Sequence, residues 1–264
     1  MQILLGFGLA ILVAFAAYRA HSLSRSGAFA ATLVGAVVFG MGGWQWAALL
    51  LTFFISSSAL TRAFKKRKTG LDEKFSKGGR RDAAQVFGNG GLATVFAAIH
   101  FFQPDAPWVW VAFAACLAAV NADTWATELG VLSPRPPRMI TNPAKEVEKG
   151  TSGGISLIGT LAALGGSGVI GFLAAALGGL AAAWTMGVVL TLAGLLGSLF
   201  DSLLGATVQA IYYCPACDKE TERHPLHTCG TSTTLKRGWP WLDNDLVNLG
   251  CAIFGVAVAL LLVH

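Results

Sequence analysis

Apolar runs long enough to cross a bilayer dominate this sequence. Eight of them follow one another, separated by shorter polar stretches: residues 1–20, 27–42, 44–61, 82–102, 108–130, 151–178, 182–210 and 246–264. A helix needs about 20 apolar residues to span a bilayer, and a backbone in lipid must satisfy its own hydrogen bonds. Only 12% of the residues are charged, whereas soluble domains carry about 25%. We therefore predict a single all-α transmembrane domain over residues 1–264.

The second and third apolar runs leave the number of spans open. Both are short, and they meet at the sequence GMGGWQW. They could form a tight hairpin or two half-spans, so we expect about eight helices, in a range of roughly six to eight, some of them discontinuous. The 32 glycines fit this class of protein, because small residues let helices approach closely in lipid.

Basic residues are strongly biased among the polar connections. Nearly every Lys and Arg falls in residues 62–81, 131–150 or 211–245. If the chain starts outside and crosses at each apolar run, these three stretches share one side, which the positive-inside rule makes the cytoplasm. The first run has no basic residue before it, which argues against a cleaved signal. We predict a protein of the cell inner membrane or its equivalent, and interpret the basic stretches as topology signals rather than nucleic-acid sites.

The stretch NADTWATELG places two carboxylates at the end of the fifth apolar run. At about 100° per residue, its five polar side chains fit an arc of about 160°: Asn121, Asp123, Thr124, Thr127 and Glu128. We expect this stripe to face the bundle interior, and the rest of the helix to face lipid or its neighbours. Carboxylates at membrane depth are costly unless paired, hydrated or bound to metal, so a divalent cation is the favoured explanation. The alternative is a helix end in water, with Glu128 solvated.

Asp201 lies deep in the seventh apolar run. It shares a helix face with Ser198 and Ser202, which are three residues before it and one after it. We expect Asp201 to join Asp123 and Glu128 around one Mg²⁺.

The last apolar run opens with the polar sequence WLDNDLVNLG. Asp243 or Asn244 could simply cap that helix. Asp245 and Asn248 are three residues apart on one face, which favours a shared site.

Two segments combine glycines with basic residues. In KGGRRDAAQVFGNGG, a Gly78–Gly79 turn precedes Arg80 and Arg81, and Asn89 projects on the same side as Gln85. A flexible turn rich in N–H groups beside two arginines is suited to bind phosphate.

The segment KEVEKGTSGGISLIGT has the stronger anion signal. Lys145 precedes the expected start of a helix at Thr151, Ser152, Gly153 and Gly154. Free N–H groups at a helix N-terminus, surrounded by hydroxyls and lysines, bind phosphate oxygens. The alternative is that Thr151 or Ser152 is an ordinary helix cap.

All these groups fall at cytoplasmic helix ends in the predicted topology. Carboxylates, Mg²⁺ and basic phosphate ligands together are typical of phosphoryl transfer, in which positioning and charge neutralisation supply most of the catalysis. Buried carboxylates and broken helices also make cation sites in transporters, so a cation-coupled transporter is the alternative class.

The cysteines divide into two kinds. Cys214, Cys217 and Cys229 share the polar stretch 211–245 with His227 and His224. Their CxxC spacing is typical of a small zinc knuckle, with His227 favoured as the fourth ligand. Reduced cysteines without metal are the alternative, and a cytoplasmic loop disfavours a disulfide. Cys116 and Cys251 lie in apolar runs and are expected in the core.

Five strings of this sequence resemble a membrane family known by a domain of unknown function, number 92, which includes phytyl-phosphate kinases. They occur in the family's order: GGRRDAAQVFGNGG, NADTWATELGVLS, KGTSGGISLIGT, GSLFDSLLGATVQ and DNDLVNL. The positions that lie in matching motifs are Asn89, Asn121, Asp123, Glu128, Ser152, Asp201 and Asn244 or Asp245.

The resemblance implies a kinase that uses CTP, or another nucleoside triphosphate, to convert an isoprenyl monophosphate such as phytyl phosphate to the diphosphate, as in tocopherol metabolism. In this scheme Asp123, Glu128 and Asp201 hold Mg²⁺ with Asn121 beside them. Lys145 and residues 151–154 hold the nucleotide, and Arg80 and Arg81 bind the acceptor phosphate. A kinase of the free isoprenoid alcohol is a further alternative. The oligomeric state is left open, with a dimer as one option.

Overall fold

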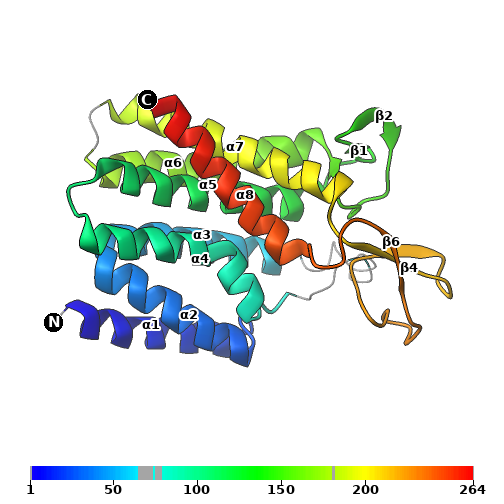
Figure 1. Ribbon diagram of the computed structural model, residues 1–264, viewed down its shortest axis with the longest axis horizontal. Coiled ribbons are helices and arrows are strands. Elements are labelled where there is room, and N and C mark those ends of the chain that lie inside the picture. Colours follow the sequence, from blue (N-terminus) through cyan, green and yellow to red (C-terminus); the bar gives the residue numbers. More distant parts are fainter. Residues whose placement is uncertain (1, 65–73, 75–78, 180–181, 264) are drawn as a thin grey trace.

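The computed structural model describes residues 2–64, 74, 79–179 and 182–263. Several lysines and arginines of the basic cluster at 62–81 lie outside these residues. In the described part, eight α-helices form the body of the protein (Figure 1): α1 (Gln2–Arg19), α2 (Arg25–Val37), α3 (Trp44–Ala63), α4 (Ala83–Phe102), α5 (Pro107–Gly130), α6 (Leu157–Leu177), α7 (Ala183–Thr207) and α8 (Asn244–Val263). The prediction of a helical membrane protein is confirmed.

Seven of the described helices are long and apolar enough to span a membrane. The remaining one, α4, carries Gln85, Asn89 and His100 among its apolar residues. The short second run is a full span, because α2 continues through a π-helical turn, η1 (Val38–Gly42). The chain then reverses at Gly43, whose φ of +95° favours glycine. The second and third runs are therefore two full spans joined by a tight turn, and α3 packs on η1 and α5.

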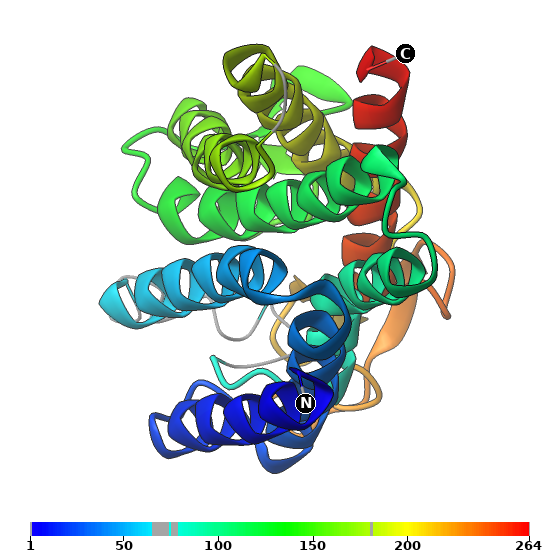
Figure 2. The same cartoon turned by 90° about the vertical axis from the view of Figure 1, so that its left-hand side faces the viewer.

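Helix α5 is the centre of the fold. It packs against α3, α4, α6, α7 and α8 (Figure 2). Of its most apolar 18-residue segment, 78% is buried inside the protein. Its alanines permit this close packing; Ala118 and Ala122 are fully buried. The sequence left open whether the side of this helix opposite its polar stripe faces lipid or other helices. The structure shows that it faces other helices, so the polar side chains of α5 point toward several different helices.

Helices α1 and α2 form a separate layer. They pack on each other, and α2 also packs on α4. Figure 2 shows this layer on one side of α3 and α4, with α5 to α8 on the other. Only 17% of the 18-residue apolar segment of α1 is buried, which is consistent with a helix that contacts lipid.

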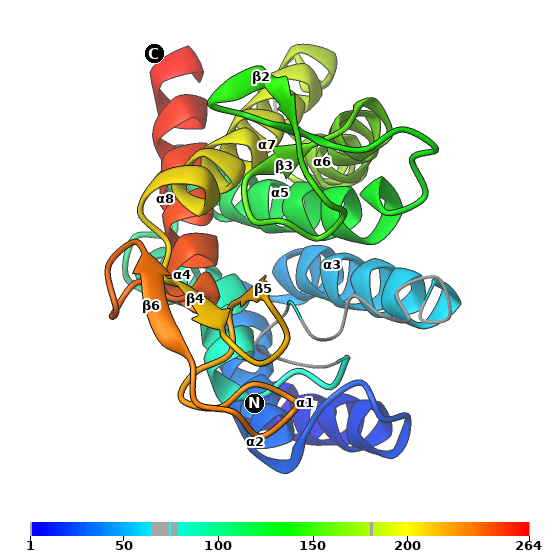
Figure 3. The same cartoon turned by 90° about the vertical axis from the view of Figure 1, so that its right-hand side faces the viewer.

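Two small sheets occupy one end of the bundle, in regions expected to be loops. The first has strand order β2-β1-β3, formed by β1 (Arg138–Met139), β2 (Asn142–Glu146) and β3 (Gly154–Ile155). The second has order β5-β4-β6, formed by β4 (Ile211–Cys214), β5 (Lys219–Thr221) and β6 (Thr234–Arg237). Figure 3 looks onto this end, and both chain termini lie at the opposite end (Figure 1). The polar connections therefore gather at one end, as the alternation of spans predicts.

Candidate functional site: an acidic centre beside an apolar cleft

Two aspartates from adjacent helices lie near the sheet end of the bundle. Asp123 is on α5 and Asp201 is on α7, and the Asp123 carboxylate is hydrogen-bonded to the Ser198 side chain. The two carboxylates are close enough to repel each other. The helices approach closely because position 197 is glycine; a Cβ on Gly197 would lie 2.7 Å from Cβ of Ala119.

Glu222 is the third carboxylate at this centre, and the sequence interpretation missed it. It directly follows β5 and lies in electrostatic contact with both Asp123 and Asp201. The Ser152 hydroxyl and the Gln209 amide each donate to its Oε1 at 2.9 Å. Glu222 lies in a polar stretch with no helical period, so only the pairing of strands far from α5 in sequence brings it here.

Cations border the same centre. Arg237 on β6 donates to the carbonyls of Gly205 and Ser152, at 2.7 and 3.3 Å. Burial lowers the pKa of Arg237, and the charges of Glu220 and Glu222 oppose that shift. Arg237, Lys74, Ser152 and Glu222 line a common pocket of about 20 Å³. This volume holds roughly one water molecule.

The acidic centre has the chemistry of a magnesium site. Mg²⁺ prefers oxygen ligands and is usually bound by one or two carboxylates together with waters and substrate phosphates. Oδ2 of Asp201 is buried and accepts no hydrogen bond from the described residues, so one ligand oxygen is available. Among the described residues, no three carboxylates bring one oxygen each to within 4.8 Å of one another. Asp123, Asp201 and Glu222 thus fit a partly hydrated ion better than an all-protein cage.

Glu128 lies apart from the acidic centre. Its Oε1 accepts a hydrogen bond of 2.9 Å from Thr61 on α3, and its charge interacts with Arg81. Because α5 is surrounded by helices, Asp123 faces α7 whereas Glu128 faces α3. The structure brings together two of the three residues expected around one metal, and replaces Glu128 with Glu222.

The two adjacent arginines point in different directions. Arg81 packs its guanidinium over Phe53 and Phe54, at 5.4 and 5.7 Å from the ring centroids. Burial lowers the pKa of Arg81 to about 10, and the charge of Glu128 opposes that shift. Arg80 is exposed and contacts His21 at 2.5 Å. Of the proposed Gly78–Gly79 turn, Gly78 lies outside the described residues.

An apolar cleft of about 310 Å³ opens beside Arg81. Side chains from α1, α2, α3 and α4 line it, and those lining residues are apolar except for Arg81, Gln85 and Asn89. Gln85 completes a capping box with Asp82, and Asn89 donates to the Gln85 carbonyl at 2.9 Å. The cleft therefore combines an apolar body with one half-buried cation and two amides.

The expected helix start at Thr151 is wrong. Helix α6 begins at Leu157, with the Ser156 hydroxyl accepting a hydrogen bond from Gly159 N. The cause is Gly153, which has a φ of +86° and packs against Ala206 so closely that a Cβ would lie 2.5 Å away. Residues 151–155 form a turn and β3, so no helix N-terminus is available there for phosphate.

Candidate phosphate ligands in this segment have other contacts. The Thr151 carbonyl accepts from Gly154 N, and Ser152 donates to Glu222. Lys145 is exposed on β2 and is not among the residues that contact the acidic centre in the described part of the chain. Ser152 thus belongs to the site as a support for Glu222.

Asn121 ties three helices together. Its Oδ1 accepts hydrogen bonds from Ser56 at 3.1 Å and Ser57 at 3.3 Å, and its Nδ2 donates to the Gly166 carbonyl at 2.8 Å. Because the residue is fully buried and its amide is engaged on both sides, its position indicates a structural role.

The start of α8 contains one cap and two buried polar groups. The Asp243 carboxylate accepts from Leu246 N at 3.1 Å, so it is Asp243 that caps the helix. Asp245 and Asn248 are buried, and Asn244 is half-buried. One further turn along α8, Cys251 lies in electrostatic contact with Asp201 and Asp123. The buried face of α8 therefore leads toward the acidic centre.

Comparison with known proteins identifies the family. Residues 8–256 match the family described as "Integral membrane protein DUF92". The chain belongs to this family. The matched residues include Asp123, Asp201 and Glu222 of the acidic centre.

Several curated relatives align over most of the chain. Protein PGR of Arabidopsis thaliana is 36% identical over 259 residues, covering 90% of this chain and 88% of that protein. The uncharacterized membrane protein MJ0933 of Methanocaldococcus jannaschii is 33% identical over 192 residues, 71% of this chain and 75% of that protein. Protein VTE6, chloroplastic, of Arabidopsis thaliana is 28% identical over 246 residues, 91% of this chain and 65% of that protein. No solved structure matches the chain.

Proposed function

We propose that this DUF92 protein is a membrane kinase that transfers the terminal phosphate of a nucleoside triphosphate, with CTP favoured, to an isoprenyl monophosphate such as phytyl phosphate. The product is the isoprenyl diphosphate. One observation carries the proposal: Asp123, Asp201 and Glu222 converge from three separate elements, and the same bundle holds a cleft that joins apolar walls to a half-buried arginine.

The cleft is suited to the lipid acceptor. Its volume of about 310 Å³ lies at the lower end of the range of small-molecule sites, about 300–1,000 Å³. The apolar walls would bind the isoprenyl chain, and Arg81 would bind the phosphate through charge-assisted hydrogen bonds. Gln85 and Asn89 offer further polar contacts in the same lining. Glu128, which interacts with Arg81, would keep that side chain in place.

The acidic centre is suited to hold the metal. Asp123 and Asp201 would bind Mg²⁺ directly, with Glu222 as a third carboxylate. An ion held there would supply positive charge to neutralise the charge that develops on the transferred phosphate. Glu128 lies five positions after Asp123 on α5, a rise of about 7.5 Å, and faces α3 rather than α7, so the acceptor phosphate would have to reach from Arg81 toward the carboxylates for the transfer.

The nucleotide must reach the acidic centre from the sheet end. Lys74 and Arg237 provide positive charge there, but the pocket between them holds roughly one water. We therefore infer that the nucleotide phosphates bind at the opening of this pocket. Their binding would require the strands around the pocket to move apart.

The transfer requires no general base. An oxygen of the acceptor monophosphate forms the new bond to the terminal phosphorus, and the bond from that phosphorus to the bridging oxygen breaks, leaving the nucleoside diphosphate. The acceptor oxygen is already ionised near neutral pH, so no hydroxyl proton must be removed. A free alcohol acceptor would need a base, and Asp123 or Asp201 would then serve.

A direct assay tests the proposal. The purified full-length protein is incubated with Mg²⁺, CTP labelled at the terminal phosphate, and either phytyl phosphate, geranylgeranyl phosphate or phytol. We expect labelled diphosphate from the monophosphates. Product from phytol alone would instead identify an alcohol kinase. Failure with every acceptor and with ATP, GTP and UTP, together with cation uptake into proteoliposomes that Asp123→Asn abolishes, would identify a transporter.

A further inference from the structure

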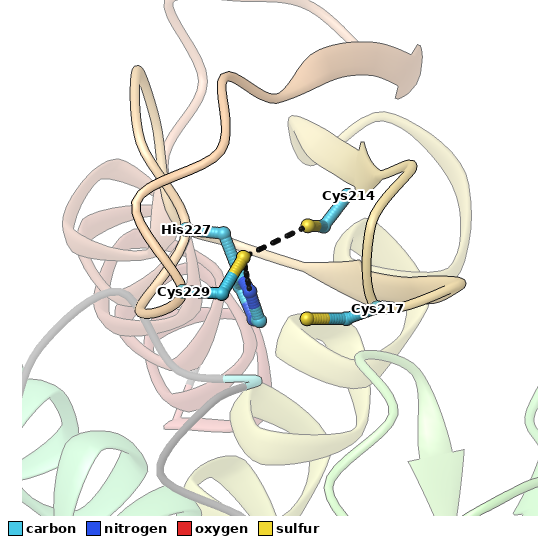
Figure 4. A group of neighbouring side chains, drawn as sticks. All are labelled: Cys214, Cys217, His227 and Cys229. Atoms are coloured by element: carbon cyan, nitrogen blue, oxygen red, sulfur yellow. Dashed lines mark hydrogen bonds between the residues drawn. The ribbon is translucent and has the colours of Figure 1, made fainter.

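A second cluster of metal-binding side chains lies outside the acidic centre, in the sheet of β4 to β6. Cys214 ends β4, Cys217 lies in the turn before β5, and His227 and Cys229 follow in the connection to β6. One ligand atom from each of the four lies within 4.8 Å of all the others. Figure 4 shows the four side chains pointing toward a common centre. Within the described residues, this is the only group of three or more such side chains that meets so closely.

The separations fit tetrahedral zinc. Sγ of Cys214 lies 3.6 Å from Sγ of Cys229, and Nδ1 of His227 lies 3.3 Å from the same sulfur. Four ligands at about 2.3 Å for sulfur and 2.0 Å for nitrogen form a tetrahedron with edges of about 3.5–3.8 Å. A disulfide requires a sulfur–sulfur distance of about 2.05 Å, and all the cysteines are free.

His227 adds an independent indication of a ligand. Only 3% of the residue is exposed, and its Nε2 is buried without a hydrogen bond to any described residue. Burying an unpaired ring nitrogen is unfavourable. A zinc bond to Nδ1, the nitrogen that lies beside Cys229, would engage one side of the ring and leave Nε2 to carry the ring proton, as in other histidines that bind metal.

The cluster also holds the hairpin that carries Glu222. Strands β4 and β5 are joined by only three residue pairs, from Tyr212↔Thr221 to Cys214↔Lys219. Hairpins this short are marginally stable without further support. Cys217 lies before Glu222 in the chain and His227 after it, so a bond from both to one ion would fix the segment on either side of that carboxylate.

We propose that Cys214, Cys217, His227 and Cys229 bind one structural Zn²⁺, which fixes the position of Glu222 at the acidic centre. Four protein ligands complete the coordination of zinc, so this ion would have no open position for substrate. Binding converts the thiols to thiolates and releases their protons to solvent. The metal site stands on its own geometry, whereas the effect on catalysis rests on the proposed kinase activity.

Metal analysis of the purified full-length protein tests the site. We expect about one zinc per chain in the wild type, with the cysteines protected from alkylation until a chelator is added. Cys217→Ser should lose most of the zinc, whereas Cys116→Ala, at a buried cysteine of α5, should keep it. A wild-type protein without zinc that also fails to bind added Zn²⁺, or a bond between Cys214 and Cys229 in a non-reducing peptide map, would overturn the proposal.

Two further measurements guard against simple misfolding. His227→Cys replaces one zinc ligand with another, so it should retain zinc and, loaded with Co²⁺, show the visible absorption of a tetrahedral thiolate site. His227→Ala should fail both tests. If both variants retain zinc equally, His227 is not a ligand and the proposed ligand set is wrong.

The link to Glu222 is tested through kinetics. Chelation, or Cys217→Ser, should lower kcat about 10- to 100-fold with little change in the KM for the lipid, and Glu222→Gln should produce a similar loss. Zinc removal that leaves kcat unchanged would refute the positioning role while leaving the metal site intact. A protein that binds zinc but phosphorylates no acceptor would refute the kinase proposal and not the zinc site.

Discussion

The two sides of this bundle are packed differently. In the layer of α5 to α8, glycine and alanine bring the helices into close contact. Of the most apolar 18-residue segment of α5, the central helix, 78% is buried. If α3 and α4 are grouped with α1 and α2 as a second, looser layer, only 17% of the most apolar 18-residue segment of its outermost helix is buried, and a cleft of about 310 Å³ remains. The tight layer holds Asp123 and Asp201, whose repulsion requires a rigid frame. The loose layer offers apolar space for a lipid. Under the kinase proposal, rigidity serves the charged reaction centre and looseness serves the acceptor.

The largest effect is expected at the acidic centre. Asp201→Asn should reduce diphosphate formation about 100- to 1,000-fold, because it removes a metal ligand from the transition state. The same change should leave the melting temperature unchanged or raise it, since it relieves repulsion between two half-buried carboxylates. Asp105→Asn, in the connection at the opposite end, is the matched control and should change neither quantity. If Asp201→Asn retains the wild-type rate, Asp201 does not hold a metal that the reaction requires.

The same substitution in the two layers compares their packing directly. Ala118 is fully buried in α5, and Ala48 lines the cleft. Ala118→Phe should destabilise the protein by about 3 kcal/mol or more through overpacking. Ala48→Phe should change stability by less than about 1 kcal/mol, but should raise the KM for long isoprenyl phosphates more than for short ones. Thermal unfolding in detergent measures the first effect, and a chain-length series the second. Equal destabilisation by both would contradict the difference in packing.

The neighbouring arginines provide a finer comparison at the cleft. Arg81→Gln should raise the KM for the lipid phosphate about 10- to 100-fold, because a charge-assisted hydrogen bond contributes about 1.5–3 kcal/mol. The KM for CTP should stay the same. Arg80→Gln, at the exposed neighbour, should alter neither constant by more than about twofold. If both variants behave alike, the acceptor phosphate does not bind at Arg81.

The smallest effect concerns a contact between the two layers. Lys74, in the connection after α3, lies 2.6 Å from Glu148, in the connection after α5. Hydrogen bonding to Lys74 and its charge lower the pKa of Glu148. The folded pKa lies below the unfolded one, so this stabilisation is present above the unfolded pKa of about 4.3 and is lost as pH falls through the folded pKa. Because Glu148 is exposed, Glu148→Gln should reduce stability at pH 7 by at most about 1 kcal/mol. A larger loss, or one that persists at low pH, would argue against an exposed ion pair.

The sequence predicts the helices well because lipid restricts the alternatives. A span must be apolar, long and internally hydrogen-bonded, so the eight apolar runs correspond to the eight described helices. Asp123 and Asp201 could be expected to meet, because a charge at membrane depth requires a partner.

The remaining features depend on tertiary structure. Helical periodicity gives the angle between Asp123 and Glu128, but it does not reveal that α5 is surrounded and that each carboxylate meets a different helix. The short strands lie in polar stretches without alternation. Glu222 reaches the acidic centre only because β5 pairs with β4, and Gly153 delays α6 through its contact with Ala206. Gly153 and Ala206 are far apart in sequence, as are Glu222 and the two aspartates it meets, so local patterns do not encode these contacts.

The contact between Gly153 and Ala206 makes the reaction centre vulnerable from a distance. A similar contact occurs at Gly238, where a Cβ would lie 2.0 Å from the Gln209 carbonyl. At both positions the chain outside the helices rests on the end of α7 or the residues just after it, with no space for a methyl group. Adding one carbon atom at either place would move a sheet away from the end of α7, so under the kinase proposal such a change would abolish activity although every charged group survived.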